Sequence, residues 1–268
     1  MNEHETGQLT ATAAEIYERF FVPALFAEWS PRVLQAAGVR PGHDLLDVAC
    51  GTGILAREAA AVVGPAGSVT GTDINDGMLA VAQEHAPGIS WKAAPAQSLP
   101  FPAATFDRVV SQFGLMFFED PVAALAEMAR VLRPGGTIAV AVWDSLANTP
   151  GYAVVAAILD ELFGPEAAQS IHAPYALGNI GKLRALFARA GLDDHMEVHT
   201  ITGKARFASV DAWMYTDIKG WTLAGIVDDQ GYEQLRHYAP QKLSRFVLAD
   251  GSVEFDAPAH IVTVTPTA

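Results

Sequence analysis

The stretch from Asp44 to Gly53 constrains this 268-residue chain more than any other. It begins as a short apolar run and then passes through Gly51 and Gly53 into a helix-forming segment, residues 54–63. A buried strand, a tight glycine turn and a helix start, in that order, are typical of a nucleotide-cofactor site. Glycine lets the backbone approach a ligand closely, and the helix N-terminus offers unpaired N–H groups.

The spacing of these glycines argues against a dinucleotide site. The dinucleotide fold uses G-x-G-x-x-G, in which a third glycine allows close helix packing. This chain has Asp47-x-x-x-Gly51-x-Gly53 and no glycine at the third position. A carboxylate at Asp47 would repel a pyrophosphate, whereas it suits a ligand with a positive amino or sulfonium group. A NAD-dependent oxidoreductase is therefore a disfavoured alternative.

Four later segments extend the pattern. Residues 68–73 are predicted to form the next strand, which ends in Asp73 roughly 20 residues after the glycines, where an acid can accept both ribose hydroxyls. Segments 96–101, 106–111 and 130–137 follow. In this order the segments resemble the motifs of the class I S-adenosylmethionine-dependent methyltransferases, in the branch that includes the ubiquinone and menaquinone C-methyltransferases. The resemblance covers residues 44–143.

The resemblance implies an α/β fold and a domain plan. We expect one Rossmann-like domain over residues 1–268, with a seven-stranded doubly wound sheet whose last strand is antiparallel. Its parts are an N-terminal helical cover (1–40), a cofactor-binding core (41–145) and a helical lid insertion (205–250). An ordinary packed helix pair is the alternative to the lid.

Local patterns predict the individual elements. We expect helices at 15–29 (interrupted at Pro23), 75–85, 152–163 and 180–190, and strands at 89–92, 107–113, 137–143, 195–206 and 259–265. Residues 172–175 are expected to form a loop, and Pro134-Gly135-Gly136 to end the preceding helix.

The cofactor implied is S-adenosyl-L-methionine, and the resemblance carries contacts onto particular residues. Met78 would lie beside the adenosine, Ala96 and Gln97 would face the adenine, and Gln112 would end a strand at the methionine. The usual acid before Ala96 is replaced by Pro95, which puts the adenine contact in doubt. The complete set of expected cofactor-binding residues is Asp47, Ala49, Cys50, Gly51, Gly53, Asp73, Ile74, Met78, Ala96, Gln97, Ser111, Gln112 and Tyr17.

No catalytic residue is identifiable. The sulfonium already activates the methyl group, so positioning is the main task left to the protein. The sequence does not choose among four histidines of the C-terminal half as a base: His172, His195, His199 and His237. An inactive cofactor-binding regulatory or scaffold protein is therefore a second alternative.

The composition of the chain restricts the classes of substrate, metal and partner that we expect. The chain has 17 Lys and Arg against 30 Asp and Glu, a net charge of −13, which disfavours nucleic acid as a substrate. Cys50 is the single cysteine, so a disulfide framework or multi-cysteine metal site is not expected and a reducing cytoplasm fits. Residues 1–14 lack Lys and Arg, and we expect neither a signal peptide nor a membrane span. We expect a small, partly apolar acceptor methylated at C or O, no metal, and a chain compatible with a homodimer.

Overall fold

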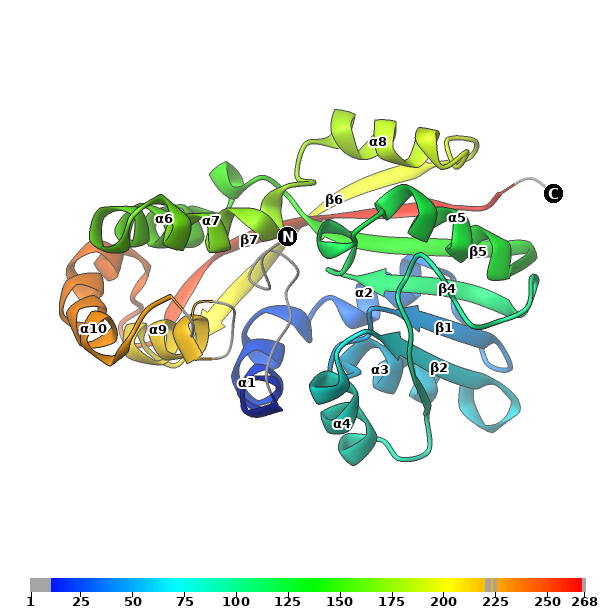
Figure 1. The fold of residues 1–268 in the computed structure, drawn as a ribbon, viewed down its shortest axis with the longest axis horizontal. Coiled ribbons are helices and arrows are strands. Elements are labelled where there is room, and N and C mark those ends of the chain that lie inside the picture. The colour runs from blue at the N-terminus through cyan, green and yellow to red at the C-terminus, as the bar shows by residue number, and fades with distance from the viewer. Residues whose placement is uncertain (1–10, 220–222, 224–225, 267–268) are drawn as a thin grey trace.

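A computed structural model describes residues 11–219, 223 and 226–266. In this part of the chain the strands form one seven-stranded sheet with the order β3-β2-β1-β4-β5-β7-β6 (Figure 1). The strand bounds are β1 Asp44–Val48, β2 Ser68–Asp73, β3 Ser90–Ala93, β4 Phe106–Gln112, β5 Leu132–Trp143, β6 Glu197–Phe207 and β7 Val253–Val264.

The sheet is wound in two directions from its centre. Strands β1, β2 and β3 pair in parallel on one side, and β4 and β5 pair in parallel on the other. Strand β7 is antiparallel to both β5 and β6. The predicted doubly wound sheet with an antiparallel last strand is therefore confirmed. The chain reverses direction between β1 and β4, and ligands of open α/β sheets bind at such a point.

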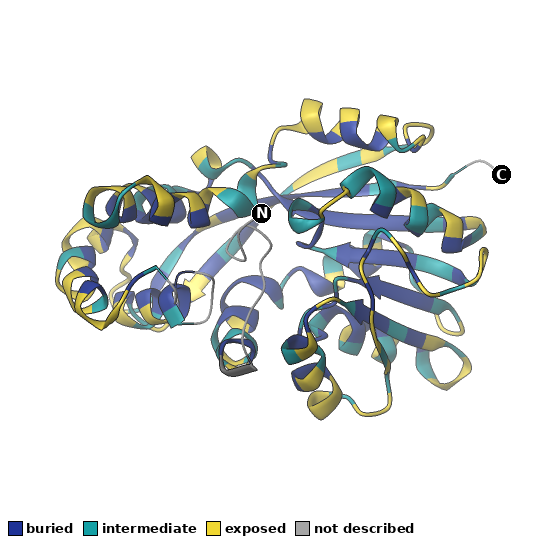
Figure 2. Ribbon diagram, in the orientation of Figure 1, coloured by how far each residue is buried: buried dark blue, intermediate teal, exposed yellow. Residues whose placement is uncertain are grey.

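Adjacent residues of the central strands enter two different hydrophobic cores. Leu45 packs with helices α2 (Ser30–Ala36) and α3 (Ile54–Val63), whereas Leu46 packs with α5 (Pro121–Val131) and α8 (Ile180–Arg189). Both faces of the sheet are thus covered, as continuous apolar runs in parallel strands require. Figure 2 shows the central strands buried between helices whose outer turns are exposed.

Strands β6 and β7 extend beyond the core into a second group of helices (Figure 1). This group contains α6 (Pro150–Phe163), α7 (Pro165–His172), α9 (Val210–Lys219) and α10 (Asp229–Leu243). The remaining elements are α1 (Ala11–Ile16), η2 (Tyr17–Phe26), α4 (Asp76–His85), and the short η3 (Gly64–Ala66), η4 (Leu115–Phe117), η5 (Leu146–Asn148), η6 (Ala173–Tyr175) and η8 (Ser244–Phe246).

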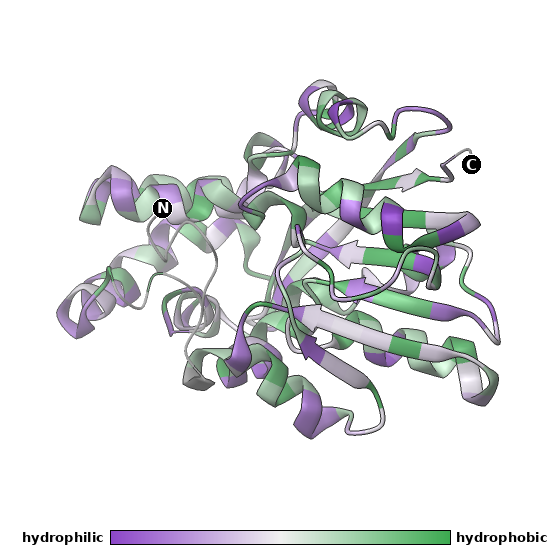
Figure 3. Ribbon diagram, turned by 45° about the vertical axis from the view of Figure 1, so that its right-hand side comes forward, coloured by the Kyte–Doolittle hydropathy of each residue, from purple (hydrophilic) through white to green (hydrophobic). Residues whose placement is uncertain are grey.

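The helices of this second group have an apolar and a polar side. Hydrophilic and hydrophobic turns alternate along them in Figure 3, as expected for helices that bury one face. The buried side carries large side chains such as Trp213 and Leu235. None of the helices in the described residues has the length and apolar character needed to cross a bilayer.

Three local predictions differ from the structure. The helix that contains Pro23 is not interrupted there but continues as the π-helix η2, whose wider i→i+5 turns tolerate a missing N–H. His172 ends α7 and residues 173–175 form η6, so the expected loop is helical. Residues 133–136 do not simply end a helix, because they form a bulge in β5 opposite Asp107. The Arg133 guanidinium holds this bulge through a 2.8 Å ion pair with Asp107.

Candidate active site

The turn after β1 lies at the point where the sheet changes direction. Ala49, Gly51 and Gly53 all have left-handed backbone conformations, with φ of 57°, 54° and 86°. At the end of the neighbouring strand β4, Phe113 has φ of 58°. Left-handed non-glycine residues such as Ala49 and Phe113 cost of order 1–3 kcal/mol each and cluster at functional sites. The ends of β1 and β4 thus lie next to each other, and both contain strained backbone.

The two glycines of the turn have different surroundings. A Cβ at Gly51 would meet no described atom within 4 Å, since this residue faces an open pocket. A Cβ at Gly53 would overlap the ring of Trp91, so Gly53 serves the packing of β3 against the turn and the start of α3. Sequence reasoning treated both glycines as ligand-facing, because spacing alone does not distinguish them.

The pocket beside this turn has a volume of about 270 Å3. All of the expected cofactor-binding residues except Gly53 and Ser111 line it. Ser111 is buried next to it, with a hydroxyl that has no hydrogen-bond partner among the described residues. Its other lining residues, which were not among the expected cofactor-binding residues, include Phe26, Thr52, Asn75, Phe117, Phe118 and Glu119.

Asp73 ties the glycine turn to the end of β2. Its carboxylate accepts hydrogen bonds from the backbone N–H of Gly51 at 2.8 Å and of Asn75 at 2.9 Å. Burial raises the pKa of Asp73, and the N–H donors of Asn75 and Gly51 oppose the shift. Since each carboxylate oxygen has further lone pairs, Asp73 can still accept hydrogen bonds from a ligand.

Asp47 is the most confined acid of the pocket. It is 1% exposed, and within the described residues neither of its oxygens makes a hydrogen bond of good geometry. Burial raises its pKa well above the usual range, the charge of Asp73 adds to this, and the backbone N–H of Ala56 opposes it. Burial, followed by Asp73 and Asp47, likewise raises the pKa of the Cys50 thiol, which keeps the thiol neutral.

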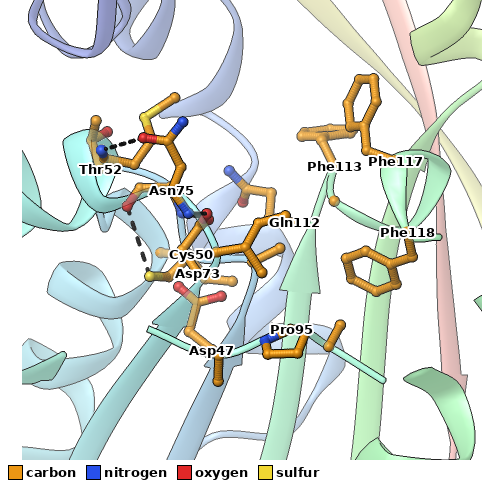
Figure 4. Close-up of a pocket in the computed structure, with 18 of the residues that line it drawn as sticks. Asp47, Cys50, Thr52, Asp73, Asn75, Pro95, Gln112, Phe113, Phe117 and Phe118 are labelled. Carbon is orange, nitrogen blue, oxygen red and sulfur yellow. Dashed lines mark hydrogen bonds between the residues drawn. The ribbon is translucent and has the colours of Figure 1, made fainter. Parts of the chain in front are cut away.

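The two walls of the pocket differ in chemistry. Figure 4 shows Asp47, Asp73 and Asn75 on one side and Phe113, Phe117 and Phe118 on the other. Such a pocket offers hydrogen-bond acceptors for a polar, cationic ligand on one side and aromatic contacts on the other.

Residues 94–97 close another edge of the pocket. Gln97 donates a 3.4 Å hydrogen bond from its amide to Glu119, so its carbonyl oxygen is available as an acceptor. Ala96 is buried, and both Ala96 and Pro95 line the pocket. Although Pro95 stands where the family usually has an acid, the side-chain oxygen of Gln97 is a nearby hydrogen-bond acceptor.

The N-terminal segment covers the pocket and is fastened at two places. The Gln112 amide donates to the carbonyl of Phe26 at 3.2 Å and accepts from the Ser30 hydroxyl at 3.3 Å. Arg57 bridges Glu18 and the carbonyl of Thr52, both at 2.6 Å. These contacts place Tyr17 of η2 at the pocket, stacked on Phe26 with 5.1 Å between ring centroids. Burial, followed by the charge of Asp73, raises the pKa of Tyr17.

A second, narrower cavity of about 60 Å3 adjoins the first. The two share Tyr17, Phe26, Phe113 and Phe117 in their walls. The rest of the second cavity is built largely from aromatic side chains of β5, α6 and η6, namely Trp143, Tyr152 and Tyr175. Because the shared residues come from η2 and from the end of β4, a small molecule in this cavity would lie next to a ligand in the first.

The four histidines named as candidate bases line neither cavity in the described residues. His195 and His199 are exposed near and in β6, His172 faces a surface groove between α6 and α7, and His237 is exposed on α10. Elsewhere, His260 is 2% exposed and bonds to Thr200 and to the carbonyl of Gly178, which is a structural role.

Comparison with known proteins shows which domain family and which proteins this chain is similar to. Residues 46–140 match the methyltransferase domain family. The ubiquinone/menaquinone biosynthesis C-methyltransferase UbiE of Saccharophagus degradans is 41% identical over 116 residues, which cover 41% of this chain and 47% of that protein. The chain thus spans about half the length of the curated relatives it matches.

Solved structures share the fold at low sequence identity. A putative methyltransferase from Bacillus halodurans has a TM-score of 0.58 at 18% identity, and the match covers 89% of this chain and 99% of that one. Phosphoethanolamine N-methyltransferase 2 of Haemonchus contortus, in complex with phosphomonomethylethanolamine and S-adenosylhomocysteine, has a TM-score of 0.62 at 19% identity, with coverage of 97% and 58%. Residues 46–140 are thus similar to the methyltransferase domain family and to part of the UbiE proteins, and the solved structures show that the chain shares their fold.

Proposed function

We propose that this protein binds S-adenosyl-L-methionine in the larger pocket and transfers its methyl group to C or O of a small, partly apolar molecule. The observation that carries the proposal is a pair of acids, the buried Asp47 and the half-buried Asp73, at a glycine turn whose pocket lining contains no Lys, Arg or His among the described residues. This charge pattern suits a cationic ligand with a ribose and disfavours a pyrophosphate.

The residues fit the cofactor's parts. Asp73 would accept from the ribose hydroxyls, and Asp47 would compensate the positive charge of the methionine end. Met78 and Ala96 would flank the adenine, and the Gln97 carbonyl would accept from its amino group. The bound cofactor supplies an activated methyl group, while Tyr17 and Gln112 would position the methionine end and exclude water.

The acceptor class follows from the adjoining cavity and from the relatives. Aromatic walls favour a ring over a charged chain. The UbiE proteins, by their name, are C-methyltransferases of ubiquinone and menaquinone biosynthesis. A quinol-like ring is thus one class to test, although the match ends before most of the residues that line the second cavity.

The two alternatives have less support. An oxidoreductase that binds NAD would place a pyrophosphate against Asp47. An inactive binding protein would not need a second cavity that shares four residues with the first. We propose further that the whole chain acts as one methyltransferase domain, in which η2 covers the cofactor and the helices between β6 and β7 act as a lid over the acceptor.

Calorimetry and a transfer assay test the proposal. S-adenosylmethionine and S-adenosylhomocysteine should bind, and NAD should not. Incubation with methyl-labelled cofactor and a panel of phenols, quinols and amines should label at least one acceptor. Binding of NAD without binding of S-adenosylhomocysteine would overturn the assignment. Cofactor binding without transfer to any of these acceptors would favour the inactive alternative.

A further inference from the structure

The second cavity contains a buried acid that the functions above do not use. Asp217 lies on α9, in the insertion between β6 and β7, and lines the cavity. It is 3% exposed. Its Oδ1 accepts a 3.0 Å hydrogen bond from the Tyr152 hydroxyl, whereas its Oδ2 has no partner among the described residues.

An unpartnered oxygen at this depth needs an explanation. Leaving a buried acceptor unsatisfied costs about 1–3 kcal/mol, and more if it is charged. In native proteins such groups are explained by strain, by a catalytic role or by a bound water or ion. No basic residue lines the described part of this cavity, so nothing there neutralises a carboxylate. The indole N–H of Trp213 is near Asp217 but makes no hydrogen bond of good geometry to it. Oδ2 therefore lacks a well-placed hydrogen-bond donor, which a ligand in the cavity can supply.

The walls of the cavity indicate the shape of that ligand. Phe113 and Trp143 stack with 3.8 Å between ring centroids, and Tyr175 lies 6.5 Å from Trp143 and 6.3 Å from Tyr152. Flat aromatic surfaces of this kind favour a second ring. A buried acid among them attracts an O–H or N–H donor and repels an anion.

We propose that Oδ2 of Asp217 binds the O–H or N–H group of a small aromatic acceptor in this cavity and takes its proton during methyl transfer. The proton moves from the acceptor's oxygen or nitrogen to Oδ2. The electron pair released on the acceptor forms the bond to the methyl carbon at O, at N or at a ring carbon, and the pair of the broken carbon–sulfur bond stays on sulfur. After attack through a ring carbon, the C–H proton of that carbon leaves and the acceptor's oxygen or nitrogen regains a proton, which restores the aromatic ring. This inference rests on the proposed methyltransferase function and adds its missing base.

The titration of Asp217 is suited to this role. Burial raises its pKa to about 8, although the Tyr152 hydroxyl and the Trp213 indole oppose the shift. A base whose pKa lies near the working pH is the most effective one. The other titratable groups that line the cavity are Tyr152, Tyr175 and Tyr17, and burial raises the pKa of each, so all three remain neutral in this range.

A binding experiment tests the recognition step. With S-adenosylhomocysteine bound, four single-ring probes are titrated by calorimetry: phenol, aniline, anisole and benzoate. Phenol and aniline should bind about tenfold or more tightly than anisole, which has no donor, and benzoate should bind weakest. Asp217→Leu should abolish the preference over anisole, whereas Tyr152→Phe should retain it. Equal binding of phenol and anisole to the wild type, or an unchanged preference in Asp217→Leu, would overturn the inference.

A pH profile tests the proton transfer. With any phenol or aniline that is turned over, wild-type kcat/KM should rise with pH and level off above about 8. Asp217→Asn keeps the shape and an acceptor oxygen, so its KM should change little while kcat falls about 10²–10⁴-fold and the acidic limb disappears. If Asp217→Asn keeps both the wild-type kcat and the acidic limb of the pH profile, Asp217 is not the base.

These measurements distinguish a failure of the proposed methyltransferase function from a failure of the proposed role of Asp217. If S-adenosylhomocysteine does not bind to the wild type, the proposed function is wrong and this inference is wrong with it. If it binds with the same affinity to the wild type and to Asp217→Asn, but the probes show no donor preference, only the role of Asp217 is wrong. Equal cofactor affinity in the two proteins also shows that the variant is folded.

Discussion

Replacement of Asp47 by Asn is expected to have two opposite effects. The free protein should become more stable, and its affinity for the cofactor should fall. Both follow from one fact, which is that Asp47 is almost completely buried beside Asp73 without a hydrogen bond of good geometry in the described structure. An uncompensated buried acid destabilises the free fold, and the same acid is what a cationic ligand would neutralise.

The stability effect has a size and a pH dependence. A buried polar group without a hydrogen bond costs about 1–3 kcal/mol, and more when it is charged, so the neutral Asn should remove part of this cost. In a protein of this size each 1 kcal/mol shifts Tm by about 2–4 °C. Because burial raises the pKa of Asp47, the stability linked to its protonation is fully present below its unfolded pKa of about 3.9 and is lost as the pH rises through the folded pKa. The advantage of Asp47→Asn should therefore be larger at pH 8 than at pH 5.

The effect on binding should be similar in size to the gain in stability and opposite in sign. Loss of a hydrogen bond to a charged group costs about 1.5–3 kcal/mol, which corresponds to roughly a 10- to 150-fold weaker Kd. Calorimetry with S-adenosylmethionine and S-adenosylhomocysteine measures Kd, and thermal denaturation at the two pH values measures stability. Asp44→Asn is a matched control on the same strand, since Asp44 lies outside the pocket and pairs with Arg133 at 2.9 Å. Unchanged affinity in Asp47→Asn, or a lower Tm at pH 8, would refute the reasoning.

Three further predictions concern the same pocket. Gly51→Val should lose cofactor binding in calorimetry, because its side chain would enter the pocket, and its φ of 54° should also lower Tm. Gly53→Val should lower Tm further, because it is strained in the same way and its Cβ would in addition overlap Trp91. Asp73→Ala should weaken binding by about 1.5–3 kcal/mol per charged hydrogen bond and also lower Tm, because the N–H groups of Gly51 and Asn75 lose their acceptor. Single histidine-to-alanine changes should each reduce turnover by less than about 100-fold, and a larger loss in any one would identify it as a base. The histidines concerned are His172, His195, His199 and His237.

The cofactor side was predictable because its signals are local in the sequence. The strand, the turn and the helix from Asp44 to Val63 follow one another directly, and Asp73 ends the next strand. The parallel pairing of β1 with β2 then brings Asp73 within hydrogen-bond distance of Gly51. Few arrangements of such neighbouring elements are physically possible, so a short motif carries most of the geometry.

Contacts between distant segments were not predictable in the same way. Trp91 fills the space beside Gly53, and Gln112 holds the carbonyl of Phe26 across 86 positions of sequence. The continuation of the N-terminal helix through Pro23 depends on a π-helical turn, which local propensity does not anticipate. Each of these features is decided by tertiary packing rather than by the order of residues.

The acceptor side has no local signal at all. Tyr152, Tyr175 and Asp217 come from α6, η6 and α9, and the closest two of them are 23 positions apart in sequence. Nothing in their spacing marks them, because the helices that carry them are brought together only by packing on the extended ends of β6 and β7.

The cofactor side and the acceptor side of the site are therefore constrained differently. The cofactor turn is fixed by backbone geometry that few residues satisfy, whereas the acceptor cavity depends on side chains that can change while the helices keep their packing. A substitution such as Asp217→Leu should accordingly alter which acceptor binds without disturbing the glycine turn, and an equal cofactor affinity in that variant would show the separation directly.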